Sequence, residues 1–109
     1  MLKKINARQK GVAYEIAIMN ELKEFFPECA TSRNESKVMD DLKVDFVHTG
    51  DFHIQAKAVE GVVQYHTLLT EMPKGKNIIF HKKNRKGTVV VMTSDVFYLL
   101  LASYLKDKK

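Results

Sequence analysis

Residues 43–57 read KVDFVHTGDFHIQAK, and this stretch decides which fold the sequence predicts. Residues 43–48 and 52–58 are rich in β-branched and aromatic side chains, which favour strands. Thr49-Gly50-Asp51 lies between them and has the composition of a tight turn. The sequence therefore predicts two antiparallel strands joined as a hairpin.

The alternation of side chains along these strands predicts a cluster of polar groups. Gln55 and Lys57 are two residues apart and are expected on one face of the second strand. Asp45 has the same parity on the first strand. The opposite face is expected to be apolar and to hold Val44, Phe46, Ile54 and Ala56. A carboxylate, an amide and an ammonium on one side of a hairpin are the outline of a metal-and-lysine site.

The segments before this stretch predict one long helix and little else. Apolar residues recur at three- and four-residue spacing over residues 8–26, which predicts an amphipathic helix that ends at Pro27. Residues 29–32 are a candidate short strand. Residues 33–42 are polar and irregular, so we expect a loop in which Asp40 and Asp41 are loop and turn residues.

The segments after it complete an α/β pattern. We expect a helix over 62–72, strands over 77–82 and 87–92 around a turn at 83–86, and a last helix over 95–106. The order α-β-β-β-α-β-β-α predicts a mixed central sheet flanked by helices, in which strand 77–82 joins beside the hairpin through a helical crossover. The length of 109 residues predicts a single domain over 1–109.

Composition narrows the expected partners and location. The net charge is +5, with basic clusters at both ends and between residues 74 and 86. Such clusters favour a polyanion, most often nucleic acid, although a merely solubilising surface is the alternative. The single cysteine, Cys29, excludes an internal disulfide. No apolar run is long enough to span a bilayer and no signal-peptide core follows the basic start, so we expect a cytoplasmic protein without a membrane partner.

The element order, with these residues in these places, resembles the PD-(D/E)xK nuclease superfamily. Its common core is α-β-β-β-α-β, with an acidic residue in the first helix, an aspartate on the second strand and (E/Q)xK on the third. Glu15, Asp45 and Gln55-Ala56-Lys57 stand at those positions. The resemblance implies a restriction-endonuclease-like core with an additional strand and a C-terminal helix.

Within the superfamily the chain is most similar to small Holliday junction resolvases of the archaeal and phage type. RQKGVAYE at residues 8–15 resembles the start of their first helix, and SRNES at 32–36 resembles their Arg-and-Ser loop. NIIFHKKNRKGTVVVM at 77–92 resembles their pair of strands with basic residues between them. Two positions differ from the usual pattern. Gln55 replaces the usual Glu, as in Mrr-like restriction endonucleases, and Val44 replaces the Pro before the aspartate.

The resemblance implies a set of site residues. Mg²⁺ or Mn²⁺ would be bound by Asp45, by Gln55, by the backbone carbonyl of Ala56 and by Glu15, all of which offer the oxygen ligands that these ions prefer. Lys57 would orient or deprotonate the attacking water, or stabilise the transition-state charge. Ser36 would bond the scissile phosphate. The expected DNA-binding residues are Arg8, Lys10, Arg33, Ser36, Lys82, Lys83, Arg85 and Lys86.

The implied function is a Mg²⁺-dependent endodeoxyribonuclease, a Holliday junction resolvase of phage or prophage type acting in DNA recombination. An Mrr-like or repair-type nuclease on duplex DNA is one alternative. A protein of the same fold that only binds nucleic acid is another, because Gln55 supplies no charge to a metal site. A resolvase that cuts two symmetric strands is expected to be a homodimer. The apolar last helix is a candidate dimer face.

Overall fold

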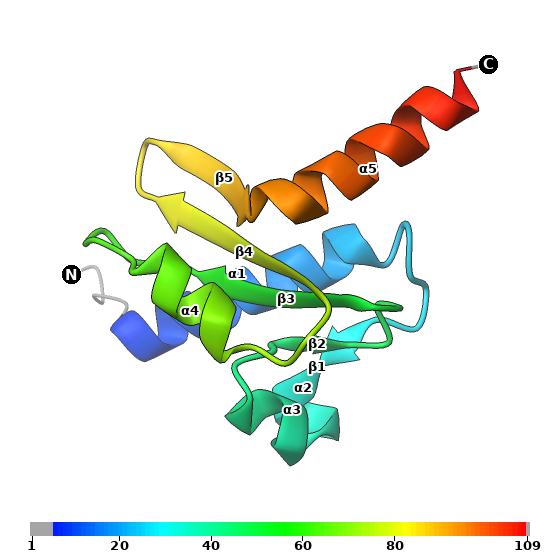
Figure 1. The fold of residues 1–109 in the computed structure, drawn as a ribbon. Coiled ribbons are helices and arrows are strands. Elements are labelled where there is room, and N and C mark those ends of the chain that lie inside the picture. The colour runs from blue at the N-terminus through cyan, green and yellow to red at the C-terminus, as the bar shows by residue number, and fades with distance from the viewer. Residues whose placement is uncertain (1–5, 109) are drawn as a thin grey trace.

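The centre of the fold is a three-stranded mixed sheet in the computed structural model, which describes residues 6–108 (Figure 1). Its strands are β3 (Phe52–Lys57), β4 (Lys76–Lys83) and β5 (Gly87–Met92), in the order β3-β4-β5. β3 and β4 are parallel, with Lys57 opposite His81, and β4 and β5 are antiparallel. The expected mixed sheet flanked by helices is confirmed.

Helices cover both faces of this sheet. α1 (Ala7–Leu22) and the start of α5 (Ser94–Asp107) lie on one face, where Tyr14 and Ile18 join Ile54 and Ile78 in one apolar core. α4 (Tyr65–Glu71) lies on the other face (Figure 1), where Leu68 and Leu69 share a second core with Ile79. Because α4 connects the parallel strands β3 and β4, the expected helical crossover is also confirmed. No helix within residues 6–108 has the length and apolar character needed to cross a membrane.

The expected hairpin is wrong in its strand pairing. β2 is only Phe46–Val47, and it pairs with β1 (Ala30–Thr31) in a separate two-stranded sheet instead of with β3. Lys43 and His48 adopt positive φ angles of 67° and 66°, a backbone conformation that does not continue a strand. The tight turn itself is present, with Gly50 at φ 63°.

The residues expected on one apolar face of the hairpin lie in two different cores. Val44 is fully buried in the core beneath α4, whereas Phe46 and Ile54 lie in the core beneath α1. The chain crosses the edge of the sheet between residues 44 and 46, so strict alternation over residues 43–48 does not hold. Asp45 lies at this crossing.

The loop expected over residues 33–42 is replaced by two single-turn helices. These are α2 (Ser32–Glu35) and α3 (Lys37–Asp41). The Ser36 hydroxyl caps α3 by accepting a hydrogen bond from the Met39 N–H, and the buried Ser32 hydroxyl donates to the Val44 carbonyl at 2.5 Å. A helix of one turn is too short to show a 3.6-residue period, so the sequence pattern could not reveal it.

The other element boundaries differ by a few residues. α1 ends at Leu22 and not at Phe26, and the chain then turns so that the Phe26 ring packs edge-to-face against Phe52. α4 begins at Tyr65 instead of residue 62, and residues 58–64 are irregular. β5 and α5 agree with the expected ranges to within one residue at each end.

Substitution of Ser32 by Ala tests the bond that ties α2 to the chain before Asp45. Ser32 is fully buried, and its loss would leave the Val44 carbonyl without that donor. We expect Ser32→Ala to lower the free energy of unfolding by about 1–3 kcal/mol in urea titrations. Ser103→Ala, at an exposed position of α5, is the control and should change little. Equal stability of the two variants would contradict this role of Ser32.

Candidate active site

Asp45 is held against the edge of β3 by two hydrogen bonds, although it lies outside the strands. Its N–H donates to the Ile54 carbonyl at 2.9 Å, and its Oδ2 accepts from the Ala56 N–H at 2.8 Å. The N–H and C=O groups of one strand residue point to the same side. The Ala56 carbonyl therefore also points away from β4 and toward Asp45.

Glu15 approaches this edge from α1. Its Oε2 accepts a hydrogen bond from Arg33 of α2 at 3.1 Å, and the Glu15 side chain is only 13% exposed. Arg33, which was expected to bind DNA, thus forms an ion pair with Glu15. Three separate elements, α1, α2 and β3, meet at this point.

Burial raises the pKa of both carboxyl groups. It raises the pKa of Asp45 to about 7, the Ala56 N–H and Lys57 oppose this rise, and Glu15 and Asp40 add to it. Burial also raises the pKa of Glu15 above its ordinary value, against the attraction of Arg33 and Lys57. Glu15, Asp45 and Lys57 are therefore close enough to act on one another electrostatically. A buried acidic pair of this kind is stabilised by an added cation.

Asp40 belongs to the same electrostatic cluster, contrary to its interpretation as a loop residue. It lies on α3 and raises the pKa of both Glu15 and Asp45. Its Oδ1 lies 3.5 Å from the Ser32 hydroxyl. No sequence spacing marks Asp40, because its approach depends on the unexpected short helix.

Gln55 contributes a buried oxygen without a partner. Its side chain is 7% exposed, and its Oε1 accepts no hydrogen bond from any described residue. An orphaned acceptor of this kind costs about 1–3 kcal/mol, so buried acceptors usually have a ligand, a water or a protein donor. Gln55 and Lys57 alternate with Ala56 and share the α4 side of β3.

The oxygen donors around this edge are of the type that hard divalent cations prefer. Among residues 6–108 no group of three or more His, Cys, Asp and Glu side chains forms a metal site by itself. A cation at this edge would instead be bound by two carboxylates, the Gln55 amide oxygen and the Ala56 carbonyl. These are all oxygen donors, as Mg²⁺ and Mn²⁺ prefer.

Ser36 has a different contact from the one expected. Its hydroxyl oxygen accepts from the Met39 N–H and thereby caps α3. This is a structural role at the N-terminus of α3, and no interaction of Ser36 with Glu15, Asp45 or Lys57 accompanies it. Its expected contact with a phosphate stays a prediction.

Non-covalent contacts link the β4–β5 turn and the end of β4 to α1. The Glu60 carboxylate accepts from the Asn84 N–H and forms an ion pair with Lys10 at 2.9 Å. Lys82 lies over the Tyr14 ring, with its Nζ 5.9 Å from the ring centroid. The exposed basic residues at this end of the molecule are Arg8, Lys82, Arg85 and Lys86, and Lys83 is partly buried.

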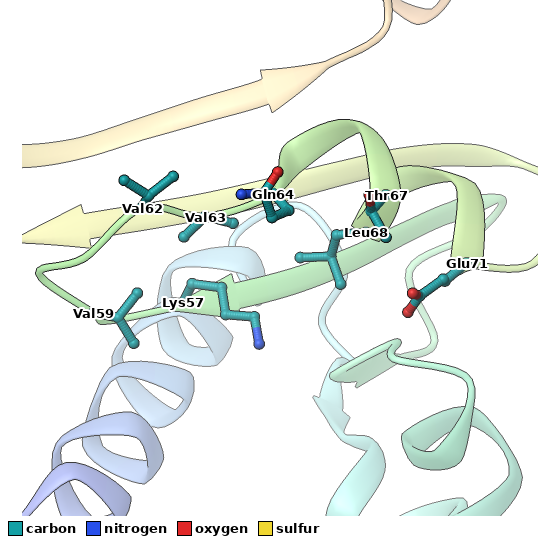
Figure 2. A pocket seen from close by; sticks show the side chains of 8 residues that line it. All are labelled: Lys57, Val59, Val62, Val63, Gln64, Thr67, Leu68 and Glu71. Carbon is teal, nitrogen blue, oxygen red and sulfur yellow. The ribbon is translucent and has the colours of Figure 1, made fainter.

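Lys57 also borders a cavity of about 270 Å³ between β3, residues 59–63 and α4 (Figure 2). Sequence reasoning did not anticipate this cavity, because its walls depend on how the irregular segment 58–64 folds back. No protein-family model, curated protein or solved structure matches the chain. The interpretation of the site therefore rests on its geometry and chemistry.

Replacement of Asp45 by Asn tests the raised pKa of the Asp45 carboxyl group. Because the folded state raises the Asp45 pKa from 3.8 to about 7, its contribution favours folding below pH 4 and is lost as the pH rises through 7. Without divalent ions, Asp45→Asn should be more stable than the wild type at pH 8, by at most about 4 kcal/mol. The advantage should shrink toward pH 4.

Thermal unfolding of both proteins at several pH values measures this difference. The amide oxygen of Asn can still accept from the Ala56 N–H, so the comparison isolates the charge. A stability difference that does not change between pH 4 and 8 would contradict the perturbed pKa.

Proposed function

We propose that this protein is a metal-dependent DNA endonuclease of the PD-(D/E)xK type. The observation that supports the proposal best is the partly buried Asp45 carboxyl, with a pKa of about 7, beside Glu15 and Lys57. Two carboxyl groups that disfavour ionisation and a nearby lysine match the needs of metal-assisted phosphodiester hydrolysis. The orphaned Gln55 oxygen supports the same interpretation.

The element order is compatible with a restriction-endonuclease-like core. When the single-turn helices α2 and α3 are left aside, α1-β1-β2-β3-α4-β4 has the order α-β-β-β-α-β. β5 and α5 are then the additional strand and helix. The pairing of β2 with β1 instead of β3 is a local departure from a continuous sheet.

Each residue has a distinct chemical task in this proposal. A bound divalent cation supplies Lewis acidity, which lowers the pKa of water and offsets phosphate charge. Asp45 and Glu15 would hold the cation as carboxylates, which requires Asp45 in its deprotonated form. Gln55 and the Ala56 carbonyl add neutral oxygens. Lys57 holds the attacking water or stabilises the charge that develops on the phosphate.

Arg33 acts through Glu15. Its guanidinium fixes the Glu15 carboxylate by the 3.1 Å contact and lowers the Glu15 pKa against the effect of burial. Arg33 is 41% exposed, so it can also approach a phosphate that enters the site. The proposed role of Arg33 thus combines positioning of Glu15 with DNA contact.

DNA is the proposed polyanion, and a four-way junction is its proposed form. The net charge of +5 and the basic β4–β5 turn support a nucleic-acid partner. The junction, the phage or prophage type and the cytoplasmic location derive from the sequence resemblance. An Mrr-like nuclease on duplex DNA and a protein that only binds nucleic acid are the alternatives.

A second copy of the chain is the proposed partner of α5. The C-terminal half of α5 extends away from the sheet (Figure 1), and β5 pairs on one side only. Apolar side chains on these two elements are 38% to 62% exposed, namely Val89, Val90, Phe97, Tyr98, Leu99, Leu101, Tyr104 and Leu105.

The exposed apolar side chains of β5 and α5 support the proposed dimer by the area that they offer. Val89 and Val90 lie on opposite faces of β5, so one contact covers only part of this set. Burial of about 100 Å² by all eight side chains, half the area of a buried aromatic residue, would give an upper limit of roughly 800 Å² per protomer. That is the usual contribution of one partner to a stable interface. β5 is an apolar edge strand without charged residues, and such edges tend to pair with other strands. The β5 strand of a second copy can pair with it across a two-fold axis.

Cleavage of a synthetic four-way junction tests the proposed activity. With Mg²⁺ or Mn²⁺ the wild type should cut the junction in preference to a linear duplex of the same sequence, and chelation should abolish cutting. Asp45→Asn should lower the rate by at least about 100-fold, since it removes a charged ligand from the site. Asp41→Asn, an isosteric change at an exposed position of α3, is the matched control and should retain activity.

The outcomes separate the alternatives. Preferential cutting of duplex DNA would favour the Mrr-like alternative. DNA binding without cutting, together with no heat of Mn²⁺ binding in calorimetry, would favour the protein that only binds DNA. Absence of both binding and cutting, or full activity of Asp45→Asn, would overturn the proposal.

Sedimentation analysis tests the proposed dimer. The wild type should sediment as a dimer at micromolar concentration. Phe97→Glu combined with Leu101→Glu should produce a folded monomer, because both positions are exposed in one copy. Ser103→Glu is the control for added charge on α5 and should stay dimeric. A wild type that is monomeric at every concentration would contradict the proposed face.

A further inference from the structure

The cavity beside Lys57 is not used by the proposed chemistry. Its volume is about 270 Å³, and its walls come from β3, from the segment after it and from α4 (Figure 2). Aliphatic side chains form most of the lining. The complete lining consists of Lys57, Val59, Val62, Val63, Gln64, Thr67, Leu68 and Glu71.

We propose that this cavity binds one unpaired nucleobase of the DNA, whose neighbouring phosphate then lies at Lys57. The inference rests on the proposed nuclease function and deepens it, because it names the feature of DNA that the site selects. Single-stranded ends carry bases without a pairing partner, and a paired base next to a branch can leave its stack at a lower cost than a base within an intact duplex.

The size and polarity of the cavity match a single base. Small-molecule pockets usually measure about 300–1,000 Å³, so a cavity just below this range has room for one ring system. A base has two flat apolar faces, which Val59, Val63 and Leu68 can cover. The polar groups of Gln64, Thr67 and Glu71 are available for its edge.

Charge favours a base over a phosphate inside the cavity. Lys57 is the single cationic residue of the lining, and Glu71 places a carboxylate on the α4 side. Lys43 lies 3.8 Å from that carboxylate and partly offsets its charge, and the carboxylate can still accept a hydrogen bond from an exocyclic amino group of a base. Lys57 borders both the cavity and the carboxyl pair, so a phosphate at Lys57 and a base in the cavity can belong to one nucleotide.

The exposed apolar side chains of the cavity wall also support the binding of a ligand. Val62 is 85% exposed, and Val59 is 42% exposed, although both are large apolar residues. The segment that carries them is nevertheless anchored, because the Val59 carbonyl accepts from His81 Nε2 at 2.8 Å and Glu60 accepts from the Asn84 N–H. A fixed apolar wall beside a basic turn suits a ligand with an apolar base and an anionic backbone.

The start of α4 is fixed by the same histidine. His81 Nε2 donates to the Val59 carbonyl, and His81 Nδ1 shares a second hydrogen bond of 2.7 Å with the Tyr65 hydroxyl. His81 is buried at 3% exposure. The cavity is therefore preformed on both of its sides, which reduces the entropy cost of binding.

Filling the cavity tests the inference. Thr67→Phe places a ring in it from an exposed helical position, and Thr70→Phe places the same ring on α4 outside it. The probe is a four-way junction that carries 2-aminopurine in turn at each nucleotide next to the branch, without divalent ions. This fluorophore is quenched when stacked and brightens when it leaves the stack.

We expect one probe position to brighten on binding to the wild type and to Thr70→Phe but not to Thr67→Phe. Thr67→Phe should also raise the Kd for the junction roughly tenfold, the usual effect of losing one base contact. Val62→Ser, a change at a surface position that leaves the fold intact, should raise the Kd in the same direction. Circular dichroism checks that all variants are folded.

Two results would overturn the inference alone. One is that the wild type binds and cuts the junction while no probe position brightens. The other is that brightening and Kd are the same in Thr67→Phe and Val62→Ser as in the wild type. If the wild type neither binds nor cuts the junction, the proposed function fails and the inference fails with it.

Discussion

The hydrogen bond from the Ala56 N–H to Asp45 Oδ2 is the contact on which the candidate site depends. β3 is an edge strand of its sheet, and an unpaired edge needs acceptors for its outward N–H groups. A side-chain oxygen takes this place at Ala56, where a neighbouring strand would otherwise supply a carbonyl. The same bond holds a carboxylate at the edge, with its second oxygen available. Closing the sheet edge and positioning the acidic group are thus one interaction.

The polar groups of the site lower the stability of the folded protein relative to apolar residues in the same places. The cause is their burial without full compensation. Asp45 and Glu15 are both driven toward their neutral forms by burial, and Gln55 Oε1 has no donor. Natural proteins tolerate such local conflicts chiefly where function requires them. Arg33 and Lys57 only partly offset the acidic charge, because burial outweighs their attraction. The two apolar cores on the faces of the sheet supply the stability that permits this conflict.

The sequence pattern was reliable where one local period described a whole element. β5 and α5 extend over at least six residues with a clear apolar character, and their boundaries were predicted to within one residue. The pattern failed around Asp45, where positive φ angles at Lys43 and His48 shorten β2 and turn it toward β1. Asp40 was missed for the same reason, since only the short helix α3 brings it to the site. The partners of a strand and the end of a one-turn helix depend on tertiary contacts that no alternation of residue types records.

The neutral Gln55, which weakens the resemblance to a PD-(D/E)xK site, can be explained by charge within the proposed function. Asp45, Glu15 and Asp40 together carry a charge of −3 when ionised, which one divalent cation and Arg33 balance. Lys57 then leaves the centre with a net positive charge for a phosphodiester of charge −1. A carboxylate at position 55 would cancel that charge in a buried place where electrostatic interactions are strong. Among the described residues, Arg33 and Lys57 are the cations that act on Glu15 and Asp45, and both are already counted in this balance. An amide at this position therefore keeps an oxygen for the cation and keeps the site attractive to the anionic substrate.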